Sequence, residues 1–201
     1  MINKTYTTYL AGSIEALTSS EMTSWRDEVT EKIKSTSLLI YDPVKMEADK
    51  VGKPSGQQCE YIKNLKQAGH WNIFGDEMRK IWFSSITPDA HIYELFMELR
   101  SRALIDGNTS SEMVNWGDYE AVCRSTFIIV YWPKDTKTVG TIYEVMLAFL
   151  LHIPIYLILP DMPKTKCNSS LIYGVMLSGG EIFYSINEMT KFVKEKYNLN
   201  K

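Results

Sequence analysis

The spacing of apolar side chains in the first part of the chain alternates between strand and helix patterns. Residues 5 to 11 are β-branched and aromatic, which predicts a short strand. Residues 21 to 34 repeat apolar side chains every three or four positions after Ser19 or Ser20, a pattern typical of an amphipathic helix with a polar residue at its start. Leu38 to Tyr41 predicts a second strand.

The last part of the chain shows the same alternation. Residues 126 to 132 form a continuous apolar, β-rich run, as expected of a central strand covered on both faces. A predicted helix over residues 139 to 152 and a predicted strand from Ile153 to Leu159 follow. A strand, a helix and a second strand in this order are typical of a right-handed βαβ unit with parallel strands. A strand from Glu181 to Ser185 and a helix over residues 187 to 197 complete the pattern.

The middle of the chain, residues 46 to 115, has weaker patterns, and we interpret it as a helical insertion. Its clearest element is a helix from His91 to Leu104, where apolar residues recur at helical spacing. A second helix is expected from Ser111 to Arg124. Residues 1–201 therefore predict a single α/β domain, with a doubly wound, mainly parallel five-stranded sheet of the Rossmann or flavodoxin-like kind.

The composition narrows the possible partners. The chain is 45% apolar and 23% charged, with 24 acidic and 22 basic residues, which argues against a disordered chain and against a binder of nucleic acid polymers. Cys59, Cys123 and Cys167 are odd in number and widely spaced, which predicts reduced thiols in the cytoplasm. The most apolar stretch, Val145 to Leu159, is shorter than the roughly 20 residues of a membrane span, so we expect no membrane partner.

Ligands of open parallel sheets bind beyond the carboxyl ends of the strands, so the residues that follow each strand are candidates for a site. Gly12 and Ser13 follow the first strand. Glycine at this place would let the backbone approach a ligand closely, although an ordinary turn glycine fits equally well.

The segment after the central strand has the features of an anion site. Thr138 can cap the following helix, and the first amides of that helix, at Gly140 and Thr141, can receive a phosphate. Glu144 follows on the same helix face and can point into the same cleft. The alternative is a glutamate that only suits the helix dipole, and the spacing alone leaves both interpretations open.

Three separate segments form a recognisable set: Tyr-Leu-Ala-Gly from Tyr9, Asp118 ahead of the central strand, and Val139 to Ala148 followed by Ile-Pro-Ile from Ile153. Together they resemble the nucleoside 2-deoxyribosyltransferase family, which includes the 2′-deoxynucleoside 5′-monophosphate N-glycosidases. The resemblance covers both ends of the chain in the right order. Residues 46 to 115 are longer than the corresponding family segment and have no counterpart in it.

The resemblance implies a double displacement at the anomeric carbon of deoxyribose. The Glu144 carboxylate would attack C1′ and form a covalent glycosyl-enzyme, which water or another base resolves. Asp118 would protonate the departing base, and Tyr9 would lie near the nucleophile. A helix-terminal aspartate and a core tyrosine are the structural alternatives. The implied chemistry needs no metal or organic cofactor.

Position 138 departs from part of the family. Transferases that act on free nucleosides carry an aspartate where this chain has Thr138, whereas the monophosphate hydrolases carry a serine. An aspartate would repel a 5′-phosphate, and a hydroxyl beside helix amides would not. We therefore expect a nucleotide substrate. Lys134 and Lys137 would add positive charge nearby, or would simply be solvated.

Two further positions carry weaker implications. Family members complete each site with a residue from a neighbouring subunit, which implies a homodimer or higher homo-oligomer with shared sites. Ser178 is the candidate for this phosphate contact, or is part of a turn. Asp42 would border the base pocket, or only stop the second strand.

The leading hypothesis is therefore cleavage of a 2′-deoxynucleoside 5′-monophosphate by hydrolysis or base exchange, with a small-molecule partner. One alternative is a transferase that uses free nucleosides, and another is a nucleotide-binding sensor without turnover. Phosphoribohydrolases of the cytokinin-activating type are less similar, because the chain lacks their glycine pair before Gly-Thr-x-x-Glu. Trp71, Trp82 and Trp116 would stack on a base or, for most of them, fill the core.

Overall fold

The computed structural model describes residues 5–14, 18–84, 86–134 and 139–199. Five strands form one sheet in the order β2-β1-β3-β4-β5, and every neighbouring pair is parallel. This order is that of flavodoxin-like doubly wound folds, so the predicted fold class is confirmed. The strands are β1 (Tyr6–Gly12), β2 (Leu38–Tyr41), β3 (Phe127–Tyr131), β4 (Ile155–Ile158) and β5 (Glu181–Phe183).

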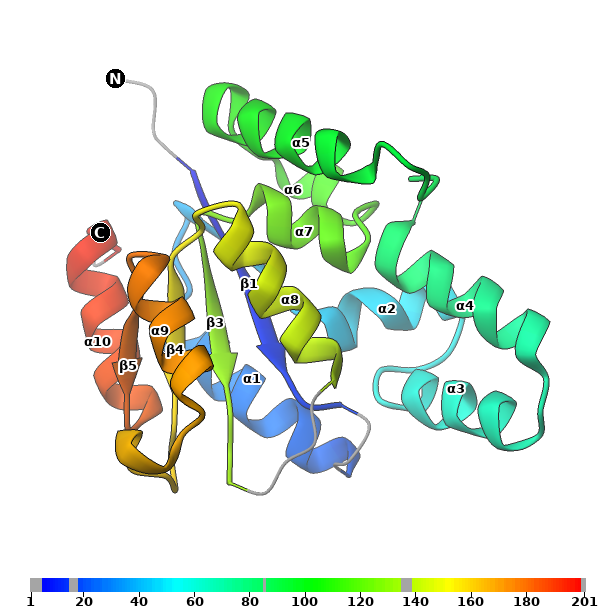
Figure 1. Cartoon of the computed structure of the whole chain (residues 1–201), viewed down its shortest axis with the longest axis horizontal. Coiled ribbons are helices and arrows are strands. Elements are labelled where there is room, and N and C mark those ends of the chain that lie inside the picture. The colour runs from blue at the N-terminus through cyan, green and yellow to red at the C-terminus, as the bar shows by residue number, and fades with distance from the viewer. Residues whose placement is uncertain (1–4, 15–17, 85, 135–138, 200–201) are drawn as a thin grey trace.

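The alternation of side chains along the strands explains why helices cover both faces. Leu10 of β1 and Ile129 of β3 belong to the apolar cluster under α1 and α10, whereas Tyr9 and Ile128 belong to the cluster under α7, α8 and α9. Figure 1 shows α8 and α9 in front of the sheet. The covering helices are α1 (Ser19–Ile33), α7 (Asp118–Arg124), α8 (Val139–Leu150), α9 (Ser169–Leu177) and α10 (Ile186–Tyr197).

The chain between β2 and β3 is helical, as expected of the insertion. Helices α3 and α4 pack on each other around a small apolar cluster of their own, which contains Ile62, Leu65 and Ile81. They extend sideways from the sheet, at the right of Figure 1. The helices of this segment that precede α7 are α2 (Pro43–Val51), α3 (Gln57–Gln67), α4 (Trp71–Phe83), α5 (Ile92–Asp106) and α6 (Ser110–Met113).

Most predicted elements match the structure within one or two residues at each end, and two helices differ in how they begin or break. The helix expected from Ser111 to Arg124 is split into α6 and α7, and the break includes Gly117. A Cβ on Gly117 would lie 2.4 Å from the carbonyl oxygen of Trp82, so this close approach of two backbones requires glycine. The first helix is capped by Thr18 rather than by a serine, because Thr18 forms a capping box with Glu21.

The strand order reverses between β1 and β3, and the carboxyl ends of these strands are where such folds bind ligands. Helix α2 follows β2 directly and α8 follows β3, so both helices begin near this edge. No helix within the described ranges is long and apolar enough to cross a membrane.

Candidate active site

A hydrogen bond joins the two segments that the sequence pointed to most strongly. The Tyr9 hydroxyl donates to Oε1 of Glu144 over 2.6 Å, from the middle of β1 to the second turn of α8. Tyr9 is fully buried and Glu144 is half-buried. Oε2 of Glu144 is buried and accepts no hydrogen bond from the residues described. One carboxyl oxygen is therefore held in place, and the other remains available for chemistry.

The environment of Glu144 favours its neutral form. Burial raises the pKa of Glu144 to about 8, and the nearby charge of Asp118 acts in the same direction. The hydrogen bond from Tyr9 lowers this pKa, because it stabilises the carboxylate. Tyr9 thus opposes the effect of burial on the group that a nucleophilic role requires to be ionised.

Asp118 is the first residue of α7 and is almost completely buried. The hydroxyl of Tyr41 lies 3.4 Å from its Oδ1. Burial raises the pKa of Asp118 to about 6, against the lowering effects of Lys50 and of hydrogen bonds from Glu47 and Tyr41. The charge of Asp118 raises the pKa of Glu144, so the predicted acid and the predicted nucleophile lie close enough to interact.

Two charged residues of α2, which the sequence did not single out, belong to the same site. Glu47 is in hydrogen-bond contact with Asp118, and Lys50 Nζ donates to the Tyr41 hydroxyl over 2.8 Å. The Tyr41 ring stacks on Tyr9, with centroids 5.5 Å apart. The signal that could have revealed them is their position in the sequence, because α2 starts directly after a strand that ends at the ligand-binding edge.

Asp42 has structural contacts in this chain. Its Oδ1 accepts from the Val44 amide over 3.1 Å, which caps α2, and lies 3.5 Å from Nε of Arg26. Arg26 is fully buried and donates to the carbonyl of Gly12. These contacts join α1, α2 and the end of β1.

Apart from Ser178, the other residues predicted to contact a substrate are Gly12, Ser13, Thr138, Gly140 and Thr141. A Cβ on Gly12 would lie 2.7 Å from the ring of Trp25, so the lack of a side chain here makes room for this ring. Ser13 and Thr141 are buried, whereas Gly140 is exposed in the first turn of α8. Thr138 and Lys137 lie outside the described residues.

Ser178 is not brought to this site. Its hydroxyl accepts from the Ile155 amide over 3.1 Å and donates to the Val175 carbonyl over 2.7 Å. Ile155 is the first residue of β4, so Ser178 lies at the amino edge of the sheet, opposite the edge that carries Glu144. The contacts of Ser178 join α9 to β4 within one chain.

Comparison with known proteins gives a likeness of fold. No family model and no curated protein matches the chain. The crystal structure of a conserved protein from Enterococcus faecalis V583 is similar, with a TM-score of 0.51 and 12% sequence identity over 96% of this chain and 99% of that one. At this identity the similarity establishes the doubly wound fold and nothing about the reaction.

Aromatic side chains of the insertion border the two acids. Trp82 of α4 stacks on Tyr119 with centroids 5.3 Å apart, and Tyr143 lies 6.3 Å from Trp82. Tyr119 follows Asp118 in the chain and Tyr143 precedes Glu144, so this contact links α4 to both helices of the site. Trp71 is exposed and Trp116 is buried in the core.

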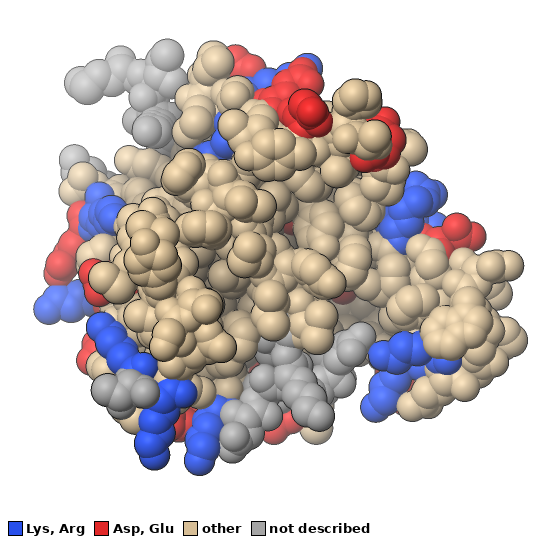
Figure 2. Space-filling view, viewed as in Figure 1, with Lys and Arg blue, Asp and Glu red and all other residues tan. Residues whose placement is uncertain are grey.

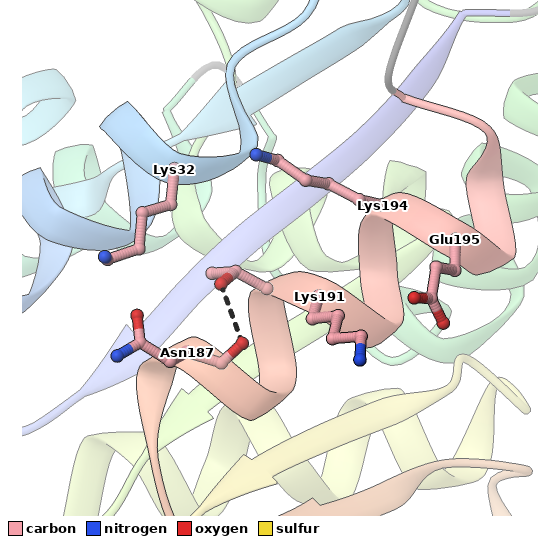
Figure 3. Close-up of a pocket in the computed structure, with 6 residues that line it drawn as sticks. Lys32, Asn187, Lys191, Lys194 and Glu195 are labelled. Atoms are coloured by element: carbon pink, nitrogen blue, oxygen red, sulfur yellow. Dashed lines mark hydrogen bonds between the residues drawn. The ribbon is translucent and has the colours of Figure 1, made fainter.

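A separate pocket lies between α1 and α10, on the other face of the sheet from α8 (Figure 3). It is lined by Lys32, Asn187, Thr190, Lys191, Lys194 and Glu195, and the only carboxylate among them is Glu195. This pocket therefore lacks the pair of acids found near the carboxyl ends of β1 and β3. Within the described part of the chain, no group of three or more His, Cys, Asp or Glu side chains is arranged to hold a metal ion.

Proposed function

We propose that this protein cleaves the N-glycosidic bond of a 2′-deoxynucleoside 5′-monophosphate, by hydrolysis or by base exchange. The observation that carries the proposal is the 2.6 Å hydrogen bond from Tyr9 to Glu144 beside the buried carboxyl of Asp118. The three residues come from separate segments of the chain, and they meet at the carboxyl edge of the sheet where doubly wound folds bind ligands.

Glu144 has the geometry of a nucleophile in this reaction. Its Oε1 is held by Tyr9, and its Oε2 accepts no hydrogen bond from the described residues and can attack C1′ of the sugar. Cleavage passes through an oxocarbenium-like state, and a buried carboxylate stabilises this positive charge before it bonds to the carbon. A covalent deoxyribosyl ester on Glu144 follows, and water or a second base displaces it with overall retention.

The departing base needs a proton, and Asp118 is a buried acid whose charge acts on the proposed nucleophile. Its pKa of about 6 lies below the pKa of about 8 for Glu144, so Asp118 loses its proton first as the pH rises. Ionised Glu144 and protonated Asp118 therefore coexist in only a small fraction of molecules, unless another group supplies the proton.

A 5′-phosphate fits the start of α8 better than a free hydroxyl does. Gly140 exposes the first turn of this helix, where backbone amides and the helix dipole favour an anion. Thr138 supplies a hydroxyl where the transferases for free nucleosides carry an aspartate. A transferase acting on free nucleosides is the second candidate, and a non-catalytic nucleotide sensor is the third.

The test incubates the protein with a panel of deoxynucleosides and their monophosphates, with and without an acceptor base, and measures the base that is released. We expect turnover of monophosphates and loss of at least about 1,000-fold in Glu144→Ala, because the covalent step is removed. Mass spectrometry of acid-quenched parent enzyme should detect a deoxyribose 5-phosphate adduct that maps to Glu144. Equal turnover of free nucleosides would favour the second candidate, and binding without turnover the third.

We further infer that a second copy of the chain covers an apolar surface on α8 and α9, here called the α8/α9 face. Figure 2 shows this side of the molecule largely free of charged residues, which lie at its margins. Eight side chains about half exposed present on the order of 800 Å², the area that each partner contributes to a standard interface. They are Val139, Ile142, Tyr143, Met146, Leu150, Tyr173, Met176 and Leu177.

An isologous contact suits this surface because neither helix places a lysine, arginine, aspartate or glutamate on it. Two copies related by a two-fold axis would therefore meet without repulsion between like charges. Tyr143 belongs to the face and precedes Glu144 in the chain, so the contact would lie beside the proposed site.

A further inference from the structure

Two buried carboxyl groups are in contact within the site. Glu47 of α2 and Asp118 of α7 are hydrogen-bonded to each other, and each is 5% exposed or less. A hydrogen bond between two carboxyl groups requires a proton on one of them, because two adjacent carboxylates repel each other strongly in a buried environment. The pair therefore stores one proton beside the proposed nucleophile.

We propose that Glu47 is the positioning residue that stores this proton and passes it through Asp118 to the departing base. The inference rests on the proposed function and adds the source of the proton to it. Nothing in the sequence motif predicts this role, because Glu47 lies in the segment that has no counterpart in the family.

The order in which the carboxyl groups titrate supports this assignment. Burial and the proximity of Asp118 raise the pKa of Glu47 well above its ordinary range, whereas the pKa of Asp118 is about 6. The proton of the pair therefore resides on Glu47 when Asp118 is ionised, because two carboxylates in contact within a buried site repel each other strongly. Once Glu144 is also ionised, the site contains a nucleophile and a proton donor together, which Asp118 and Glu144 alone provide only rarely.

The surroundings of the pair offset the charge that remains after the proton leaves. Lys50 lies one turn along α2 from Glu47, and its Nζ donates a hydrogen bond to the Tyr41 hydroxyl. This hydroxyl lies 3.4 Å from Oδ1 of Asp118. Burial lowers the pKa of Lys50, and the two acids raise it. The titratable or charged groups that interact with Glu47 are Arg26 of α1, Lys50 of α2, Tyr9 and Tyr41 of the sheet, Asp118 of α7 and Glu144 of α8.

The step balances without a further reactant. The bond between C1′ and the base nitrogen breaks, and its electron pair stays on the nitrogen, which takes the proton that moves from Glu47 to Asp118. Oε2 of Glu144 forms the new bond to C1′. In the second half, water or an acceptor base attacks C1′, the ester bond returns its electrons to Glu144, and the proton of the attacking group restores the pair.

The test compares Glu47→Gln with the parent, using base release as a function of pH. Glutamine keeps the shape and still donates a hydrogen bond to Asp118, but it has no proton to transfer. In the parent we expect kcat/KM to rise through about pH 8 and then remain high. In the variant the reactive form needs protonated Asp118 beside ionised Glu144, so we expect a bell between about pH 6 and about pH 8 and a loss of about 100-fold, from the two-unit separation of the two pKa values.

Two further variants separate proton supply from a packing effect. Glu47→Asp keeps a transferable proton and should retain the alkaline optimum of the parent at a reduced rate. Glu77→Gln removes another buried carboxyl, which belongs to α4 and pairs with Lys80, and should leave the pH profile unchanged. A folded Glu47→Gln enzyme with the parent's pH profile would overturn the proposal.

A measurement on the parent alone provides a second test if Glu47→Gln does not fold. The 5-fluorouracil and uracil deoxynucleotides differ in how much their departing base needs a proton, because fluorine stabilises the base anion. With Glu47 as the store, the ratio of their rates stays constant as the pH rises through about 6. A ratio that increases in favour of the fluorinated base from this pH upward would show that Asp118 acts alone.

The two possible failures can be told apart. Absence of base release by the parent from every monophosphate contradicts the proposed function, and the role of Glu47 falls with it. Base release by the parent, combined with an unchanged profile in folded Glu47→Gln, contradicts the role of Glu47 and leaves the proposed function standing.

Discussion

The hydroxyl of Tyr9 has an effect on Glu144 that is opposite to the effect of burial. Removing it takes a hydrogen bond from a carboxylate, and bonds of this kind contribute about 1.5–3 kcal/mol. The same change raises the pKa of Glu144, because this bond lowers it. The residue is therefore expected to act on reactivity more than on the architecture of β1.

We expect Tyr9→Phe to lower kcat/KM at neutral pH by about 10- to 100-fold. The rise of activity with pH should also move above the parent value of about 8, because less of Glu144 is ionised at each pH. Steady-state kinetics across the pH range measures both effects. A lower rate with an unmoved profile would assign Tyr9 to packing.

Glu144 should also lower the stability of the folded chain at alkaline pH. Its pKa is about 8 in the folded protein and 4.5 for an ordinary glutamate, so the folded state binds more protons between these values. The free energy of unfolding therefore decreases as the pH rises through this range.

Glu144→Gln carries no such charge, and we expect its stability relative to the parent to increase by roughly 3 kcal/mol between pH 5 and pH 8. Thermal unfolding of both proteins at the two pH values measures this difference. A constant difference at both pH values would point to a packing effect instead.

The family resemblance named Tyr9, Asp118 and Glu144, and the strand order explains why their segments meet. Tyr9 lies in β1, α7 with Asp118 precedes the neighbouring strand β3, and α8 with Glu144 follows it. Glu47 meets Asp118 only because α2 and α7 pack at the same edge, a contact between distant segments that no local pattern encodes. The close approach of the Trp25 ring to Gly12 is likewise a contact with another element that no local pattern reveals.

At the scale of elements, helices and strands were predicted best where apolar and polar positions contrast clearly. β2 was predicted with its observed limits, and β3 was recognisable as a run buried on both faces. Helix α9 was not predicted, because Ser169–Leu177 contains no charged residue and so has no amphipathic pattern to reveal it. The break between α6 and α7 depends on Trp82, which belongs to the insertion.

Gly117 offers a test of this break. We expect Gly117→Ala to destabilise the protein by about 1–3 kcal/mol, because the added Cβ meets the backbone of Trp82 and Phe83 and one of the two segments must move. Chemical denaturation measures the loss. Gly174→Ala in α9 is the control, since its Cβ has no neighbour within 4 Å and alanine favours the helix. Equal stability of the two variants would contradict the proposed reason for the break.

At the scale of the whole molecule, the distribution of charge is uneven. Charged residues lie around the margins of the view in Figure 2, and the α8/α9 face at its centre is apolar. A surface of about 800 Å² without charge exceeds the usual largest apolar patch of a monomer, roughly 300–600 Å². The face lies on the helix that carries Glu144, so the inferred contact between subunits would lie beside the proposed site.

We expect light scattering to give a mass of twice 23.1 kDa for the parent and 23.1 kDa for a variant with both Met146→Glu and Met176→Glu. Four carboxylates would then be buried in one symmetric contact, and their desolvation is unfavourable. Met97→Glu on α5 adds the same kind of charge to an exposed methionine outside the face, and should leave the dimer intact. A monomeric parent would contradict the inferred contact.

Helices α3 and α4 form a hairpin with a small apolar cluster of its own, so the stability of this hairpin is partly independent of that of the sheet. This cluster contains three buried side chains, Ile62, Leu65 and Ile81, whereas the sheet is enclosed by two much larger clusters. A unit whose own apolar cluster is this small opens by itself more often than the whole protein unfolds, so its amide hydrogens should exchange with solvent well before those of β3. Because Trp82 lies in this hairpin and stacks on Tyr119, each opening would briefly expose the wall beside Asp118 to water. The local opening of the α3/α4 hairpin would then determine how often a base can enter or leave the proposed site.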